Sequence, residues 1–220
     1  MFEDAFDSLV DVLSPPFRRV AAKSLGLTAA ILLLAWIGLH RLALLAIHVE
    51  PSWLATAISF LVGFGLFAAL AFLAAPAVSL VAGLFFDEIA AIVELKIDPA
   101  GAPGRAAPLI DGALEGLRFA GLSLVVALVS LVLLFVSGLG AVVWIAGNAY
   151  LLGRLYFELA AMRFRPLAEA RAMRRRHALT VFVHGLLIAG FVAVPLLNLL
   201  TPLFATALMA RLHKRLARAG

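Results

Sequence analysis

Four long apolar stretches dominate the pattern of hydrophobic and polar positions, and short charged segments separate them. The stretches are Leu25–Val49, Ser52–Phe86, Phe119–Leu152 and Leu179–Met209, and Arg41 is the one charged residue inside them. A membrane-spanning helix needs about 20 mostly apolar residues, and each stretch exceeds that length. The pattern therefore predicts an all-α integral membrane protein.

The first two stretches predict two full transmembrane helices, over residues 24–49 and 53–75. As one straight helix the second stretch would be ~52 Å long, whereas the hydrocarbon core of a bilayer is ~30 Å thick. Proline disrupts a helix interior, so we expect a break at Pro76. The helix beyond it runs into Asp87 and Glu88 and is expected to leave the membrane.

The last two stretches, within residues 117–152 and 179–209, predict re-entrant helix hairpins that penetrate the bilayer partway. Pro195 divides the final stretch into halves of ~24 and ~21 Å, each shorter than the ~30 Å hydrocarbon core. Gly138-Leu139-Gly140 interrupts the other stretch, whose first arm is nearly long enough to cross. Two full crossings remain the alternative, and they give the same sidedness.

The N-terminal segment, residues 1–14, predicts an amphipathic helix that ends at Pro15-Pro16. Its apolar positions are Phe2, Phe6, Leu9, Val10 and Leu13, and its acidic positions are Glu3, Asp4, Asp7 and Asp11. Two placements are open. The helix lies along the membrane surface, or its acids pack on a basic face of the protein itself.

Composition supports a membrane protein, because 64% of the 220 residues are hydrophobic and 14% are charged. Soluble domains average about 45–50% apolar and about 25% charged residues. The absence of cysteine excludes disulfides, thiolate metal sites and cysteine nucleophiles. No HExxH, P-loop or GxSxG pattern occurs, and the 5 histidines lack metal-ligand spacing. We therefore expect no enzyme activity, no catalytic residue, no metal and no cofactor.

The net charge of +5 comes from basic clusters beside the apolar stretches, which favours the lipid bilayer over nucleic acid as the partner. The clusters lie within residues 18–23, 154–176 and 211–218. Basic flanks face the cytoplasm, so these loops and both termini are predicted to be cytoplasmic. Asp87, Glu88 and Glu158 are expected to pair with Arg163 or the arginines at 174–176. His184, inside an apolar stretch, is interpreted as a neutral structural histidine.

Two positions are candidates for handling a solute. Arg18 and Arg19 begin the first apolar helix, where they are either a positive-inside anchor or a binding site for an oxyanion. Arginine offers paired donors that match sulfate or phosphate oxygens, and a helix start favours negative charge. Asn198 falls at the predicted tip of the last hairpin, where it caps broken backbone or lines a polar path.

The order and spacing of five segments resemble the CysZ sulfate-transporter family, whose domain is shared with the etoposide-induced membrane proteins. The segments are Pro15-Pro16-Phe17-Arg18-Arg19, Ala74-Ala75-Pro76 with the acidic helix at 87–94, Tyr156-Phe157-Glu158, Arg174-Arg175-Arg176, and residues 194–202 with their Pro-Leu-Leu-Asn-Leu…Pro pattern. The resemblance covers nearly the whole chain and implies one membrane domain over residues 1–220.

The resemblance implies a homo-oligomer in the bacterial inner membrane that takes up sulfate, or a related oxyanion, for cysteine biosynthesis. It also implies sulfate binding at Arg18 and Arg19. Pro16 stands where the family has glycine, so the backbone N–H at that position is missing. The alternative function is that of a membrane-organising or assembly protein without transport.

Overall fold

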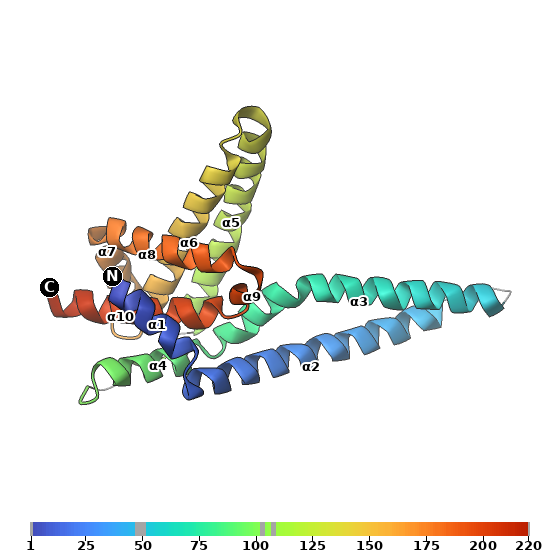
Figure 1. Ribbon diagram of the computed structural model, residues 1–220, viewed down its shortest axis with the longest axis horizontal. Helices are drawn as coiled ribbons and strands as arrows, with labels where there is room; N and C mark the ends of the chain where they lie inside the picture. The colour runs from blue at the N-terminus through green and yellow to red at the C-terminus, as the bar shows by residue number, and fades with distance from the viewer. Residues whose placement is uncertain (1, 47–51, 102–103, 107–108, 220) are drawn as a thin grey trace. The chain divides into compact units, whose positions relative to one another are not determined.

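The computed structural model describes residues 2–46, 52–101, 104–106 and 109–219, and this part of the chain is helical without strands. In chain order the helices are α1 (Phe2–Val12), α2 (Pro15–Ala46), α3 (Ser52–Gly83), α4 (Phe86–Ile97), α5 (Leu109–Ser137), α6 (Gly140–Met162), α7 (Leu167–Arg176), α8 (Ala178–Val192), α9 (Pro195–Asn198) and α10 (Thr201–Ala219) (Figure 1). The expected all-α class is confirmed.

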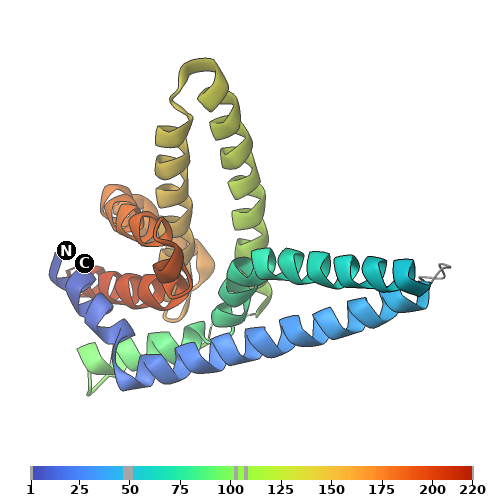
Figure 2. The ribbon, with the colours of Figure 1, turned by 45° about the vertical axis from the view of Figure 1, so that its right-hand side comes forward.

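The chain divides into two compact units, one of residues 1–18 with 85–220 and the other of residues 19–84. The second unit consists of α2 from Arg19 onward and the long helix α3, which run beside each other (Figures 1 and 2). Trp36 Nε1 donates a hydrogen bond to the Gly63 carbonyl at 3.0 Å, and the Trp36 ring stacks on His40. A Cβ at Gly63 would lie 3.0 Å from His40 Cε1, so glycine allows this close approach.

The sequence predicted a helix break at Pro76, and this prediction is wrong. Helix α3 continues through Pro76 to Gly83. The break falls at Leu84 and Phe85, immediately before α4. A proline removes one backbone hydrogen bond, and a helix in a bilayer accommodates this loss because it keeps all its other backbone groups bonded. The position of the proline alone therefore predicted a boundary that lies several residues too early.

Three helices of the described chain are long and apolar enough to cross a membrane, over Pro15–Leu45, Trp53–Leu70 and Ile110–Ser137. This is one more than the two that the sequence predicted. The additional helix, α5, has 29 residues and is ~43 Å long. The protein is therefore a membrane protein by its helix lengths and composition.

Both of the last two apolar stretches form helix–turn–helix arrangements. α5 and α6 pack side by side and are joined by Gly138 and Leu139 (Figures 1 and 2). Gly138 has a φ of +71°, a backbone conformation that favours glycine. α8 has 15 residues, or ~22 Å, and the short α9 connects it to α10.

The core of the first unit forms where α10 packs against α1, α4, α6 and α8. Every residue from Thr201 to Ala210 is buried, although α10 is not among the helices of membrane-crossing length. α6 and α8 approach very closely at two glycines. A Cβ on Gly185 would lie 2.0 Å from the Ala149 carbonyl oxygen, and one on Gly153 would lie 2.8 Å from that of Val181.

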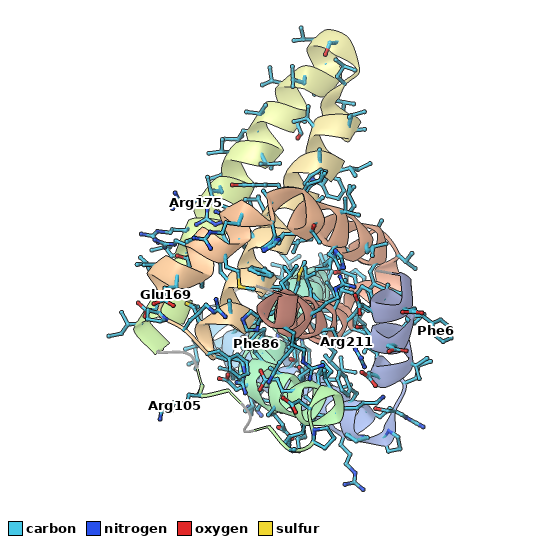
Figure 3. The ribbon with its side chains drawn as sticks, turned by 90° about the vertical axis from the view of Figure 1, so that its left-hand side faces the viewer. Phe6, Phe86, Arg105, Glu169, Arg175 and Arg211 are labelled. Atoms are coloured by element: carbon cyan, nitrogen blue, oxygen red, sulfur yellow. The ribbon has the colours of Figure 1, made fainter. Side chains whose placement is uncertain are left out.

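Helix α1 packs on α10 through its acidic face, which is the second of the two placements left open by the sequence. Buried Asp11 pairs with both Lys96 and Arg211, and Asp4 pairs with Arg215. The apolar face points outward, with Phe6 67% exposed. Phe6 and Arg211 lie on opposite sides of α1 (Figure 3). The acids of α1 are thus neutralised within the protein.

Candidate functional site

Arg18 and Arg19 lie in the first turns of α2, and both side chains are exposed. Neither forms an ion pair or a side-chain hydrogen bond with another described residue. This distinguishes the pair from many arginines of α6, α7 and α10, which have acidic partners. Two adjacent guanidinium groups therefore remain available to an anion or to lipid headgroups.

The backbone at this helix start contributes little to anion binding. The Ser14 carbonyl accepts the Arg18 N–H at 2.9 Å, so Pro15, Pro16 and Phe17 are the first three helical residues. The first three residues of a helix usually offer three free backbone N–H groups to an anion. Because Pro15 and Pro16 have no N–H, only that of Phe17 remains. Phe17 is 1% exposed. An anion at this position would be held by side chains rather than by backbone.

Asn198 is the last residue of α9, in the turn between α8 and α10. Its backbone N–H donates to the Val194 carbonyl at 2.9 Å, and its side chain is half-buried. Asn198 therefore lies in the turn between α8 and α10, and its place at the tip of a re-entrant hairpin stays a prediction. A role for the Asn198 side chain in capping or in a polar path stays a prediction.

Two buried glutamates and four arginines form a charged cluster where α5, α6 and α7 meet. Glu115 accepts hydrogen bonds from Arg118 at 2.7 Å and Arg154 at 3.1 Å, and it also pairs with Arg171. Glu158, which is 0% exposed, accepts a hydrogen bond from Arg174 Nε at 2.7 Å. Two carboxylates face four guanidinium groups, so the cluster has a surplus of positive charge.

Burial raises the pKa of Glu158 above its ordinary value, although Arg174 and Arg154 oppose that shift. Glu158 Oε2 is buried and has no hydrogen-bond partner in the described chain. The predicted pairing of Glu158 with the basic cluster at 174–176 is confirmed. Glu115 had not been predicted. The sequence did contain a signal for it, because Glu115 is followed three residues later by Arg118, just before an apolar stretch.

A second buried charge cluster surrounds Arg163, directly after α6. Arg163 Nε donates to Glu94 Oε1 at 2.7 Å, and both residues are 2% exposed. The guanidinium also pairs with Asp87 and donates to the Gly104 carbonyl at 3.0 Å. Burial alone would lower the pKa of Arg163, but Glu94 and Asp87 raise it above its ordinary value. The predicted pairing of Asp87 with Arg163 is confirmed.

His184 is fully buried in α8, as its place in an apolar stretch predicts, and both ring nitrogens have neighbours. Its Nδ1 lies 2.7 Å from the Thr180 carbonyl, which only accepts, so Nδ1 carries the proton. Nε2 lies 3.4 Å from a guanidinium nitrogen of Arg215. These contacts agree with the structural role predicted for this histidine. Among the residues that the structure describes, no group of three or more His, Cys, Asp or Glu side chains is placed to hold a metal ion.

We expect His213 to make the folded state less stable in mild acid. Burial, followed by the charges of Arg165 and Lys214, lowers the pKa of His213 from 6.5 to about 4. His213 is therefore protonated below pH ~6.5 in the unfolded chain, but only below pH ~4 in the folded chain. Stability is fully present above that window and falls by about 2 kcal/mol by pH 5. Thermal unfolding in detergent between pH 7.5 and 5 measures this loss.

The matched variant is His213→Phe, because the ring stacks on Phe164 with centroids 5.3 Å apart and its nitrogens have no hydrogen-bond partners in the described structure. The variant should lose less stability on acidification than the wild type. Parallel pH curves for the two proteins would assign the acid sensitivity to other groups.

The family model described as sulfate transporter CysZ/etoposide-induced protein 2.4 matches residues 4–202. The chain belongs to this family. None of the curated proteins matches it. The CysZ/etoposide-induced family is transporter-like rather than enzymatic, which agrees with the membrane-crossing helices. The match includes both candidate positions, Arg18–Arg19 and Asn198.

Proposed function

We propose that this protein takes up sulfate, or a related oxyanion, across the bacterial inner membrane and supplies sulfur assimilation and cysteine biosynthesis. The observation that carries the proposal is the pair Arg18 and Arg19, exposed and without acidic partners at the start of α2. Membership of the CysZ/etoposide-induced family supports the transport role. The driving force is an existing gradient, and Asn198 is the proposed contact at the turn of the last hairpin.

The proposed orientation places the basic segments in the cytoplasm. The ion pairs between α1 and α10 support it, because they hold the N-terminal and C-terminal segments together. The exposed apolar face of α1 is proposed to lie in the membrane interface, since only Leu13 and Ser14 separate α1 from the apolar helix α2. The α5–α6 and α8–α10 hairpins are proposed to enter the bilayer from the same side, in a homo-oligomer.

Sulfate flux into proteoliposomes tests the proposal. We expect the wild type to carry sulfate, and Arg18→Ala/Arg19→Ala to lose about tenfold or more of that flux, because each guanidinium–oxyanion bond contributes ~1.5–3 kcal/mol. The matched control is Arg175→Ala/Arg176→Ala, an adjacent and exposed pair at the end of α7. Insertion and orientation are verified for each variant by protease accessibility of the C-terminus.

A further variant separates an anion site from a topological anchor. Arg18→Lys/Arg19→Lys retains the positive charge that anchors the helix but loses the planar fork that matches an oxyanion. Reduced flux with normal insertion supports the site. Wild-type flux in both variants would place the site elsewhere. Well-assembled wild type that carries neither sulfate, phosphate nor chloride would reject transport and favour the alternative, a membrane-organising or assembly protein.

A further inference from the structure

A pocket of about 540 Å³ opens beside the segment that joins α6 to α7. Its walls are the 104–106 loop, Asp111 at the start of α5, and residues 162–167. All of them belong to the larger of the two units, and neither Arg18 nor Arg19 is among the lining residues. The volume is in the range of about 300–1,000 Å³ that small-molecule sites occupy. The polar lining includes Arg105 and Arg165.

The wall of this pocket is held in place by buried interactions. The Arg105 N–H donates to the Arg163 carbonyl at 2.9 Å, and the Gly104 N–H donates to Glu94 Oε2 at 2.8 Å. A Cβ on Gly104 would lie 2.7 Å from Arg163 Cβ, so only glycine allows the loop to come this close. The Arg163 cluster therefore fixes the loop, and with it the backbone from which Arg105 extends.

Phe164, which also lines the pocket, is held by aromatic contacts. Phe164 stacks on His213, and Lys214 Nζ lies 4.5 Å from the centroid of the Phe164 ring. Burial and the nearby charges of Arg165 and Lys214 leave His213 neutral at pH 7. The cations in this part of the structure are therefore arginine and lysine side chains, whose charge is constant at neutral pH.

Neither of the two arginines of the pocket forms an ion pair in the described structure. No ion pair or side-chain hydrogen bond joins Arg105 or Arg165 to another described residue. Arg165 Nε is buried and lacks a hydrogen-bond partner in this part of the chain. A buried donor without a partner is costly, so an occupant that accepts this hydrogen bond would be favoured. Neighbouring Leu167 begins α7, whose first N–H groups are also free of helix bonds.

We propose that this pocket binds a sulfate or phosphate group, held by Arg105, Arg165 and the N-terminus of α7. Paired guanidinium groups match a tetrahedral oxyanion, and a helix start adds favourable donors. Asp111, which also lines the pocket, accommodates a neighbouring ammonium or hydroxyl of a larger ligand. The inference stands apart from the proposed transport function, because it uses none of the residues assigned to that function.

The oxyanion has two possible sources, a free anion and a phospholipid headgroup. Asp111 lies within α5 at the end of a stretch of membrane-crossing length, so headgroups are close to the pocket. Isothermal titration of the full-length protein in detergent with inorganic sulfate, inorganic phosphate and short-chain phosphatidylglycerol separates the two sources. The test variant is Arg105→Gln/Arg165→Gln, and the control with equal loss of charge is Arg175→Gln/Arg176→Gln.

We expect binding to weaken by about tenfold or more in Arg105→Gln/Arg165→Gln and to remain near the wild-type level in the control. Loss of inorganic-anion binding identifies a free oxyanion as the ligand. Loss confined to phosphatidylglycerol identifies a headgroup site. No binding of any of the three probes, or an equal loss in the control, would overturn the proposal.

A second measurement uses the wild-type chain alone. Phenylglyoxal modifies arginines, and a bound oxyanion shields those that contact it. We expect sulfate, phosphate or phosphatidylglycerol to slow modification of Arg105 and Arg165 but not of Arg175. Protection of Arg18 and Arg19 alone would support the transport site and contradict this pocket. Protection of Arg105 and Arg165 alone would support this pocket and contradict an anion site at Arg18 and Arg19.

Discussion

Arg163→Ala is expected to destabilise the protein by ~3–5 kcal/mol, because it leaves a buried carboxylate without a counter-charge. Glu94 is 2% exposed and accepts hydrogen bonds from Arg163 Nε at 2.7 Å and from the Gly104 N–H at 2.8 Å. For a chain of this size the loss corresponds to a fall of roughly 6–20 °C in the apparent melting temperature. Thermal unfolding in detergent measures it.

Two companion variants show whether the unpaired charge is the cause. Arg163→Ala/Glu94→Gln should recover part of the lost stability, since a neutral amide still accepts the Gly104 N–H and no longer needs a counter-charge. Arg175→Ala removes an exposed arginine of α7 and should change the melting temperature little. If Arg163→Ala has the same melting temperature as the wild type, the charge cluster around Arg163 does not stabilise the fold.

Gly185→Ala is expected to reduce stability by ~3 kcal/mol, at the upper end of the usual cost of overpacking. A Cβ at this position would lie 2.0 Å from the Ala149 carbonyl oxygen, and backbone atoms of α6 cannot rotate away as a side chain would. α6 and α8 must therefore separate to accommodate one methyl group. The yield of monodisperse protein and its melting temperature in detergent should both fall.

Gly190→Ala is the control on the same helix, because no heavy atom lies within 4 Å of a Cβ built there. Alanine favours a helix over glycine by up to ~1 kcal/mol, so this variant should be as stable as the wild type or slightly more stable. Equal melting temperatures for Gly185→Ala and the wild type would contradict the close contact between α6 and α8.

The sequence alone predicted the parts of this protein that depend on local pattern. Apolar stretches longer than a bilayer require helices, because backbone groups in lipid must be bonded within the helix. The sequence predicted interruptions at Gly138 and Pro195. In the structure the chain leaves the helix at Gly138, and α9 begins at Pro195. Acids beside membrane segments pair with arginines, as Asp87 and Glu158 show, because the buried member of each pair, Arg163 or Glu158, requires a counter-charge.

Other features depended on the tertiary structure, since they join residues that are distant along the chain. Of the glycines in apolar stretches, Gly185 allows a close helix contact whereas Gly190 faces open space, and no local pattern distinguishes them. Glu115 meets Arg171 only because α5 and α7 both pack against α6. The orphaned Arg165 Nε is likewise a property of packing.

Local pattern therefore determined that the chain is helical and membrane-bound, because hydrophobic length and turn residues act within a few positions of one another. Tertiary structure decided which face of α1 is covered. The pattern predicts an amphipathic helix for either placement, and only the position of Arg211 and Lys96 beside Asp11 selects the acidic face. Electrostatic pairing over such separations is fixed by the packing of helices and leaves no periodic signal in the sequence.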